Sequence, residues 1–391
     1  MPPSSIWISA GEISGDLHGA ALLQALRRNS SGLPQALRRN EPALRLMGMG
    51  GPAMRSVDGF ESFFRVEQLS VMGFTEVIGQ LPKILRLLGD IEKKMKQERP
   101  QAVVVIDAPD FHFRLIKAAR RLNIPVYYYI SPKIWAWRQG RAEFIRKHVR
   151  RLISILPFEV DFYRRFGMEV DYVGNPLLDA LDLPALDQIA PQPGRIGFLP
   201  GSRRREVSAL MPEFGLAAQA LLAARPDLKF CCARAPGLGE DFLRSFWPQN
   251  LPLELFEPEE RYPAMRACEM LIAASGTVTL ETALMGIPTL IAYKMSSLSF
   301  GLAKRIIKVP FVGLPNLIAG REIFPELLQG EADGAKLARK ALEWLSPRPG
   351  GRGLPEVRAD LAELRKQVGT AGATDRAAAL ILADLASTCP N

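Results

Sequence analysis

The sequence has 391 residues, of which 48% are hydrophobic, so the chain can form two domains of ordinary size. Its net charge of +9 favours anionic partners such as nucleotides, nucleic acid or an acidic membrane surface. The four cysteines lack metal or disulfide spacing and the three histidines are far apart, which excludes a zinc cluster and indicates a reducing cytoplasm. We expect no signal peptide and, without about 18 consecutive apolar residues, no membrane span.

The first predicted strand, residues 6–10, leads into a loop with three glycines and then into a helix predicted over residues 16–28. Gly11, Gly15 and Gly19 are spaced by four, which differs from the G-x-G-x-x-G fingerprint of dinucleotide-binding loops. A second glycine cluster, residues 48–51, lacks the third glycine of that fingerprint. Tight strand-to-helix turns and ligand loops both stay open here, and an NAD oxidoreductase is disfavoured.

Residues 71–88 form an apolar stripe. After the apolar Val71 and Met72, apolar side chains recur at helical spacing, with Lys83 and Arg86 between them: Phe74, Val77, Ile78, Leu81, Ile84, Leu85 and Leu88. Pro82 is predicted to divide this helix into two pieces. The stripe is either the core-facing side of a helix or an exposed surface that touches a membrane or acyl chains.

A carboxylate follows one of the strands that are predicted to be buried. Residues 102–106 predict a fully buried strand, and Asp107 comes directly after it. The carboxyl ends of parallel strands face the ligand crevice in open α/β sheets, so Asp107 is the better catalytic candidate. Asp110, next to Pro109, is expected mainly to cap the following helix.

The stretch from Lys133 to Arg151 is strongly basic, with seven basic residues and Glu143 as its only acid. This density favours an anionic lipid surface or phosphates as a partner, although a plain basic helix stays open. A turn at residues 174–177 and a stretch rich in Pro, Asp and Ala at 179–194 then predict a linker between two α/β units.

Two turns of the second unit suit a phosphate-bearing ligand. The strand at residues 195–199 is followed by Gly201, Ser202 and Arg203, with two more arginines behind them. The strand that ends at Ala274 is followed by a small polar turn of Ser275, Gly276 and Thr277, and Glu281 lies about one helical turn further on. Free backbone N–H groups there could bind a diphosphate while Glu281 reaches a sugar hydroxyl; ordinary capped turns are the alternative.

The order of strands and helices predicts an α/β protein with two consecutive βαβ-type units that face each other across a cleft. The sequence has no Asp-x-Asp motif, which metal-dependent nucleotide-sugar enzymes often carry. Fixed donors and helix dipoles would then stabilise a leaving diphosphate. A lone carboxylate base fits direct, inverting attack by an acceptor hydroxyl.

Seven motifs occur together in one order: GEISGD from Gly11, VMGFTEV from Val71, IDAPDF from Ile106, SPKIWAWR from Ser131, LPGSR from Leu199, ASGT from Ala274 and LPNLIAGRE from Leu314. In this combination the chain, from about residue 6 to 328, resembles the lipid-A-disaccharide synthases. These are inverting glycosyltransferases with two Rossmann-like domains in the GT-B arrangement. The resemblance implies condensation of UDP-2,3-diacylglucosamine with 2,3-diacylglucosamine 1-phosphate, with release of UDP and formation of a β-1′,6-linked disaccharide, and it implies neither metal nor other cofactor.

The resemblance also implies roles for single residues. Asp107 matches the general base, which activates the 6-hydroxyl of the acceptor. The donor contacts are implied at seven positions: Ser202, Arg203, Ser275, Gly276, Thr277, Glu281 and Asn316. A loop on the acceptor side contains Glu12, Ser14 and Gly15. Two positions depart from the family pattern, because His112 stands where Asn is frequent and Asn175 where His is frequent.

The expected domains are residues 1–174, which face acceptor and membrane, and residues 175–391, which bind the UDP-sugar. The terminal helices, about 355–391, are expected to return to the first domain or to a partner subunit. The resemblance implies a cytoplasmic protein held peripherally at the anionic inner membrane, with a membrane or acyl surface formed by Val71, Met72, Phe74, Ile78, Leu81 and Leu85. It allows a homodimer and implies no nucleic acid. The alternatives are another UDP-sugar enzyme of GT-B architecture, such as an epimerase, and a non-enzymatic basic protein that binds nucleic acid or lipid.

Overall fold

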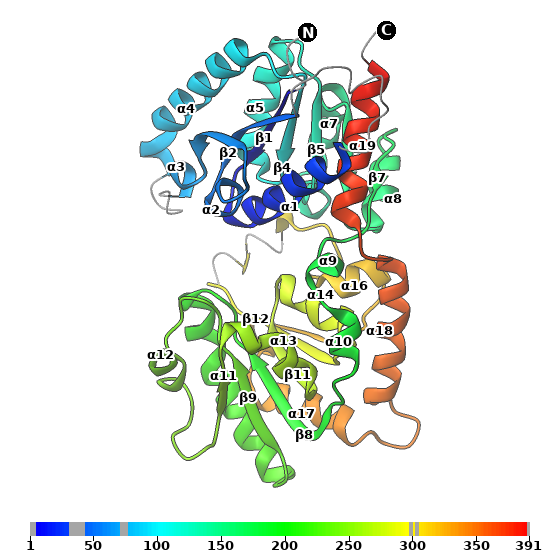
Figure 1. Ribbon diagram of the computed structural model, residues 1–391. Helices are drawn as coiled ribbons and strands as arrows, with labels where there is room; N and C mark the ends of the chain where they lie inside the picture. Colours follow the sequence, from blue (N-terminus) through cyan, green and yellow to red (C-terminus); the bar gives the residue numbers. More distant parts are fainter. Residues whose placement is uncertain (1–4, 31–43, 71–76, 297–299, 302–304, 389–391) are drawn as a thin grey trace. The chain divides into compact units, whose positions relative to one another are not determined.

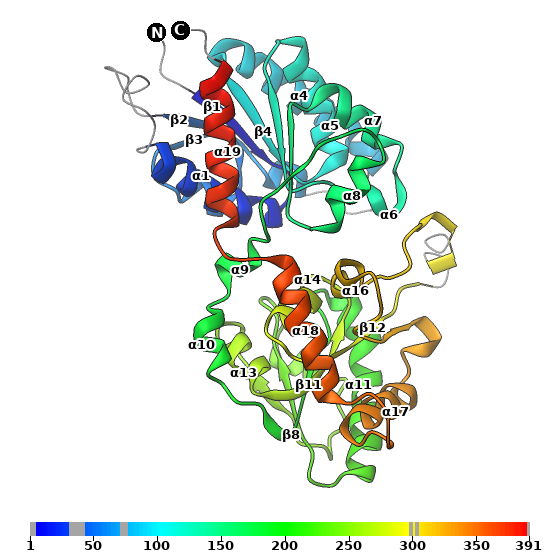
Figure 2. The same ribbon diagram turned by 90° about the vertical axis from the view of Figure 1, so that its right-hand side faces the viewer.

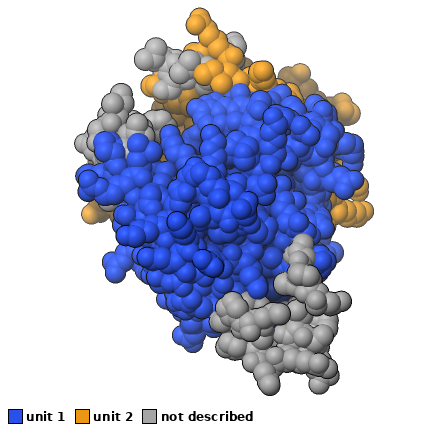
Figure 3. Space-filling model, turned by 90° about the horizontal axis from the view of Figure 1, so that it is seen from above, with its two compact units in different colours: residues 1–179, 370–391 blue, residues 180–369 orange. Residues whose placement is uncertain are grey.

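The computed structural model describes residues 5–30, 44–70, 77–296, 300–301 and 305–388. The chain divides into two compact units, which Figure 3 shows in different colours: unit 1 contains residues 1–179 and 370–391, and unit 2 contains residues 180–369. The first change of unit therefore follows residue 179, shortly after the boundary predicted at residue 174. Each unit is built on one parallel sheet (Figure 1).

The sheet of unit 1 has the order β3-β2-β1-β4-β5-β6-β7 among the described residues. Its strands are β1 Ser5–Ala10, β2 Arg45–Gly50, β3 Phe60–Arg65, β4 Ala102–Ile106, β5 Val126–Tyr129, β6 Arg151–Ser154 and β7 Asp171–Tyr172. The central strand β4 has the sequence AVVVI and is buried over its whole length, as expected for a parallel strand that is covered on both faces. β4 pairs with β1 on one side and with β5 on the other, so Asp107 follows a strand in the middle of the sheet.

Helices cover both faces of this sheet. Their bounds are α1 Ile13–Ser30, α2 Pro52–Arg55, α3 Glu67–Ser70, α4 Val77–Glu98, α5 Pro109–Arg121, α6 Ile134–Trp137, α7 Arg141–His148 and α8 Phe158–Arg164; α9 Leu177–Ala180 lies at the change of unit. Helix α1 lies on one face and α4, α5 and α7 lie on the other (Figure 2). The predicted break at Pro82 is wrong, because α4 continues through it. Pro82 lies beyond the first turn of α4, so it removes one intrahelical hydrogen bond without ending the helix.

The last helix, α19 (Ala373–Thr388), packs beside α1 in unit 1 (Figure 2). Ala377 and Ile381 join the same buried cluster as Ile6 and Val104. Asp384 accepts a hydrogen bond of 2.6 Å from the Tyr127 hydroxyl and forms ion pairs with two arginines, Arg150 and Arg151. By contrast, α18 (Leu354–Val368) belongs to unit 2, so the stretch expected to return is divided between the units.

The sheet of unit 2 has the order β10-β9-β8-β11-β12-β13 among the described residues. Its strands are β8 Gln192–Leu199, β9 Lys229–Ala233, β10 Glu254–Phe256, β11 Cys268–Ala274, β12 Thr289–Tyr293 and β13 Glu326–Leu328. The strands β8 and β11 are adjacent and parallel, with Leu199 opposite Ala273. The two polar turns predicted from the sequence therefore follow neighbouring strand ends.

The helices of unit 2 are α10 Leu183–Asp187, α11 Arg204–Ala224, α12 Glu240–Arg244, α13 Arg261–Arg266, α14 Thr277–Leu284, α16 Leu314–Ala319, α17 Gly334–Leu345 and α18. Among the described helices, α11 alone has the length and apolar composition of a membrane-spanning helix. It packs against α17, and Val207, Phe214 and Leu221 are buried on its inner side. In unit 2, α11 is therefore a core helix.

Candidate functional site

Asp107 lies at the carboxyl end of β4, directly before α5. Its side chain is partly buried, and this burial raises the pKa of its carboxyl group above the ordinary value. The positive charge of Lys133 and a hydrogen bond from the main chain of Ala108 act in the opposite direction. A carboxylate with a raised pKa is a better proton acceptor than an exposed one, which suits a general base.

The segment of residues 11–15, which contains the turn after β1 and the first turn of α1, approaches the end of β4 closely. A Cβ atom added to Gly11 would lie 2.4 Å from the Cβ of Ala108, and one added to Gly15 would lie 3.5 Å from the Ile106 carbonyl oxygen. Glu12 and Ser14 of this loop are exposed. The structure thus brings the predicted acceptor loop next to the strand end that precedes Asp107.

The predicted helix start at Asp16 is wrong, because α1 begins at Ile13. The carboxylate of Asp16 is buried and accepts hydrogen bonds from three main-chain N–H groups at the start of α2: Gly51 (2.7 Å), Ala53 (2.8 Å) and Met54 (3.0 Å). The residue therefore caps a different helix from the one that contains it.

Asp110 does not have its expected capping role. Helix α5 begins at Pro109 after Ala108, and no side chain caps it. The carboxylate of Asp110 instead forms ion pairs with Arg138 at 2.9 Å and Arg141 at 2.6 Å. Asp110 is thus an exposed link from α5 to the basic segment rather than a helix cap.

In unit 2, the two polar turns lie side by side at the carboxyl ends of β8 and β11. Gly201 has a φ angle of +102°, and a Cβ atom added to it would lie 3.5 Å from the Cβ of Ala274. The side chains of Ser202 and Arg203 are exposed, and so are Gly276 and Thr277 of the second turn. The first N–H groups of α11 and α14 have no intrahelical partner and carry the positive ends of the helix dipoles. Together these turns are suited to bind a diphosphate.

In the turn that follows β8, Arg203 already pairs with a carboxylate. Arg203 donates a 2.8 Å hydrogen bond to Glu206, although the Arg203 side chain is 81% exposed. Such an exposed pair is weak, so Arg203 can exchange it for a phosphate.

Glu281 lies in the second turn of α14, and its side chain is 13% exposed. Burial raises the pKa of its carboxyl group, while the guanidinium of Arg261, 3.9 Å away, lowers it. Arg261 in turn donates a 2.5 Å hydrogen bond to the Tyr262 hydroxyl. Arg261 and Tyr262 were not predicted as site residues, because their position beside Glu281 depends on how α13 packs against the sheet.

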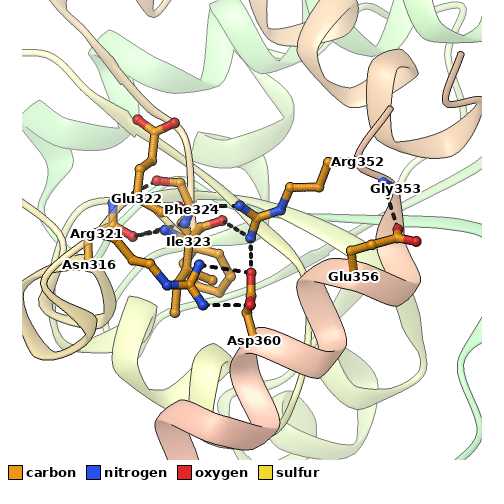
Figure 4. A network of polar contacts seen from close by, with 9 residues as sticks. All are labelled: Asn316, Arg321, Glu322, Ile323, Phe324, Arg352, Gly353, Glu356 and Asp360. Atoms are coloured by element: carbon orange, nitrogen blue, oxygen red, sulfur yellow. Dashed lines mark hydrogen bonds and ion pairs between the residues drawn. The ribbon is translucent and has the colours of Figure 1, made fainter. Parts of the chain in front are cut away.

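Asn316 is fully buried in α16, and its side-chain amide binds the chain that follows (Figure 4). Its Oδ1 accepts hydrogen bonds from the main-chain N–H groups of Ile323 (2.8 Å) and Phe324 (2.9 Å). Its Nδ2 donates to the Phe324 carbonyl at 2.7 Å and to Glu326 at 2.8 Å. These four bonds use the two donors and both acceptor positions of the amide.

The segment that follows α16, residues 321–324, is fixed to α18 by charged groups (Figure 4). Asp360 accepts hydrogen bonds from Arg321 at 2.6 Å and from Arg352 at 2.5 Å. Arg352 also donates to the carbonyl groups of Glu322 and Ile323. Since α16 packs against both α14 and α18, this network supports the helix that carries Glu281.

Of the predicted apolar surface, only Leu85 can be located by its side chain, which is 53% exposed on α4. Val71, Met72 and Phe74 lie outside the described residues, and so do the side chains of Ile78 and Leu81. Leu87 and Leu88, by contrast, are buried. The described part of the stripe therefore has one exposed and one core-facing side.

Comparisons with known proteins show the family of the chain. Residues 6–350 match the model of the lipid-A-disaccharide synthetase family. The chain belongs to this family. It is 36% identical to the lipid-A-disaccharide synthase of Myxococcus xanthus, with 97% of both chains covered, and 37% identical to that of Geobacter sulfurreducens, with 96% of both covered.

The fold is shared with solved structures of low sequence identity. MurG of Acinetobacter baumannii has a TM-score of 0.61 at 14% identity, with 97% of this chain and 100% of that chain covered. A UDP-GlcNAc 2-epimerase of Neisseria meningitidis has a TM-score of 0.60 at 12% identity, with 97% and 99% covered. The predicted fold class of two Rossmann-like domains, as in GT-B proteins, is thereby confirmed.

The family motif from Ser131 to Arg138 faces a buried carboxyl group. Glu159 of α8 accepts a 2.9 Å hydrogen bond from the Trp135 indole and another from the Ser154 hydroxyl. Burial raises the pKa of Glu159 to about 7, although these hydrogen bonds lower it. This pair was not predicted, because Trp135 and Glu159 are on different helices.

We expect Glu159 to make the stability of unit 1 depend on pH. A carboxyl group whose pKa is raised by folding stabilises the fold below its unfolded pKa of 4.5, and this contribution is lost as the pH rises towards 7. Glu159→Gln should remove this slope, so that the variant is more stable relative to wild type at pH 8 than at pH 5. Urea unfolding at both pH values measures the difference. Glu169→Gln, an exposed site in the same unit, is the control, and an unchanged slope in Glu159→Gln would contradict the assignment.

Among the described residues, no group of three or more His, Cys, Asp or Glu side chains is arranged to hold a metal ion.

Asn175, one of the two positions that depart from the family pattern, is buried and has a structural role. It donates a 3.0 Å hydrogen bond to the Ile155 carbonyl and accepts one of 3.0 Å from the Leu177 N–H.

Proposed function

We propose that this protein condenses UDP-2,3-diacylglucosamine with 2,3-diacylglucosamine 1-phosphate to give the lipid A disaccharide 1-phosphate and UDP. The observation that carries this proposal is the pair of phosphate-suited turns beside Glu281 in unit 2, in a chain of the lipid-A-disaccharide synthase family. The reaction is a direct, inverting displacement. The acceptor 6-hydroxyl attacks the anomeric carbon and forms the glycosidic bond, while the bond to the diphosphate breaks.

Asp107 acts as the general base in this proposal. It takes the proton of the acceptor 6-hydroxyl as that oxygen attacks, which requires the carboxylate form. The pKa raised by burial supports this role, because it increases the proton affinity of the carboxylate. The loop with Glu12, Ser14 and Gly15 is assigned to the acceptor side, since it borders the same strand end.

The donor is bound by unit 2. The starts of α11 and α14 stabilise the diphosphate through Ser202, Arg203, Ser275, Gly276 and Thr277, and they stabilise the negative charge that develops when UDP leaves. Glu281 accepts hydrogen bonds from the ribose hydroxyls. Asn316 acts on the donor site through α16, because its own amide is occupied by main-chain and Glu326 partners.

Arg203→Ala should weaken donor binding. The loss of one charge-assisted hydrogen bond to a phosphate raises the donor KM and the Kd of UDP by about 10- to 100-fold. The Tm should stay unchanged, because the Arg203–Glu206 pair is exposed. Titration calorimetry with UDP measures the effect, with Arg348→Ala in an exposed loop of the same unit as the control. Equal UDP affinity in wild type and Arg203→Ala would contradict this role.

We also propose that unit 1 associates peripherally with the anionic inner membrane, on its cytoplasmic face. Exposed Leu85 on α4 and a set of exposed cations on α5 and α7 support this surface: Arg114, Lys117, Arg120, Arg146 and Lys147. Both proposed substrates are acylated, so the enzyme must meet them at a lipid surface.

Flotation with phosphatidylglycerol vesicles tests this association. Binding should exceed that to phosphatidylcholine vesicles and weaken with added salt, because the attraction is screened. Equal binding to both vesicle types, or binding to neither, would contradict this association.

The homodimer stays a prediction, which sedimentation velocity can test.

The reaction itself is tested by mass spectrometry of wild-type protein incubated with both acylated substrates, with and without a chelator. The expected result is disaccharide 1-phosphate and UDP under both conditions. Incubation with UDP-N-acetylglucosamine alone tests the epimerase alternative. Formation of the manno isomer there, without disaccharide in the first assay, would overturn the proposal.

A further inference from the structure

The main chain at Asp107 and Ala108 has an unusual conformation. Their φ angles are +49° and +44°, so two consecutive non-glycine residues occupy the left-handed region. Such a conformation is strained for a residue that has a Cβ atom, and it persists only where the surrounding structure holds it. The turn lies between the buried strand β4 and the fixed ring of Pro109.

Two buried side chains hold the main-chain carbonyl of Asp107. The Tyr128 hydroxyl donates a hydrogen bond of 2.8 Å to this oxygen, and Nδ1 of His112 lies 2.7 Å from it. The Asp107 N–H donates to the carbonyl of Tyr129 at 3.3 Å. Both hydrogen-bonding groups of the Asp107 main chain are therefore bound, and the direction of its Cα–Cβ bond is fixed.

The protonation of His112 follows from its two neighbours. Because a carbonyl oxygen can only accept, Nδ1 must carry the proton. Nε2 then accepts a hydrogen bond of 3.1 Å from the hydroxyl of Ser9 in β1. The imidazole is fully buried, and this burial lowers the pKa of His112 to about 4, so it is neutral at pH 7.

These contacts come from both strands that flank β4. Ser9 lies on β1 and Tyr128 on β5, while His112 belongs to the first turns of α5. The missing Cβ of Gly11 gives Ala108 the room it needs, as the 2.4 Å approach to its Cβ shows. The turn is thus held by elements on each side, although none of these contacts is to the carboxylate itself.

We infer that His112 and Tyr128 are positioning residues, which aim the Asp107 carboxylate by holding its main-chain carbonyl in the left-handed turn. This inference rests on the proposed role of Asp107 as the base. When either hydrogen bond is lost, the turn can relax towards an ordinary conformation and move the carboxylate away from the acceptor hydroxyl. A displacement of about 1 Å lowers a rate by up to about 100-fold.

The test compares Tyr128→Phe and His112→Ala with wild type in steady-state kinetics and thermal unfolding. Each variant should lower kcat by about 10- to 100-fold, with the donor KM within about two-fold of wild type. His112→Asn should recover part of kcat, because its amide can still donate to the carbonyl. Should His112→Ala not fold, Tyr128→Phe, which loses one oxygen atom, carries the test.

Tyr129→Phe is the matched control. Tyr129 is the next residue on β5, and its hydroxyl is buried without a hydrogen-bond partner among the described residues. Loss of the hydroxyl should leave kcat within about two-fold of wild type, since Tyr129 contacts Asp107 through its main-chain carbonyl, which the substitution keeps. A kcat near that of wild type in both Tyr128→Phe and His112→Ala would overturn the inference, and so would an equal loss in Tyr129→Phe.

Asp107→Asn separates this inference from the proposed function. If Asp107→Asn is inactive while Tyr128→Phe and His112→Ala are fully active, only the positioning role fails. If Asp107→Asn retains full turnover, the base assignment fails and the inference fails with it.

Discussion

Replacing Asp107 by Asn should lower kcat by about 10³-fold, because the amide cannot take a proton from the acceptor hydroxyl. The fold should be unaffected, since burial already disfavours the charge of Asp107 and the neutral amide has nearly the same shape. Initial rates of UDP release, with both acylated substrates saturating, measure this loss. The donor KM should change little, because the donor is assigned to unit 2.

Asp110→Asn is the matched control for this variant. Asp110 is the next carboxylate in the chain, and its exposed side chain pairs with Arg138 and Arg141. Its kcat should stay within about two-fold of wild type, because an exposed ion pair contributes little. If Asp107→Asn and Asp110→Asn had equal rates, Asp107 would not be the base.

The pH dependence gives a second measure of the same residue. The base must be ionised, so kcat/KM should fall at acidic pH with an apparent pKa above the ordinary aspartate value of 3.8. The residual activity of Asp107→Asn should lack this acidic limb. An acidic limb that is identical in wild type and Asp107→Asn would assign the titration to a different group.

Replacing Asn316 by Ala should destabilise unit 2 by about 3–5 kcal/mol, since it leaves several buried main-chain groups without partners. For a domain of this size, that corresponds to a Tm lower by roughly 10 °C. Calorimetry measures the shift, and Asn250→Ala, an exposed asparagine of the same unit, is the control.

The same variant distinguishes support from direct donor contact. If Asn316 acts through α16, the protein that remains folded at low temperature should bind UDP with an affinity within a few fold of wild type. A large loss of UDP affinity with an unchanged Tm would instead mean that the Asn316 amide leaves its present partners and contacts the donor.

The features that the sequence predicted well are those with a local signal. The strand AVVVI, the carboxylate at its end and the two small polar turns all follow from residues that are close in sequence. The left-handed turn at Asp107 had no such signal, because neither Asp107 nor Ala108 is a glycine. It depends on Tyr128 and His112, which reach it only in the folded sheet.

The errors have a similar cause. Asp110 was expected to cap α5, but two arginines about thirty residues later bind its carboxylate. Asp16 was expected to begin a helix, but α1 begins three residues earlier and the Asp16 carboxylate caps α2 instead. In each case a distant partner competes successfully with the local role, and such partners cannot be read from one sequence.

The central claim is transfer of a diacylglucosamine residue to the acceptor 6-hydroxyl with inversion. NMR of the product, together with UDP release in the presence and absence of acceptor, tests it most directly. The account predicts UDP release only when 2,3-diacylglucosamine 1-phosphate is present, in equal amount to a β-1′,6-linked disaccharide. An α linkage, or UDP release that does not depend on the acceptor, would contradict it.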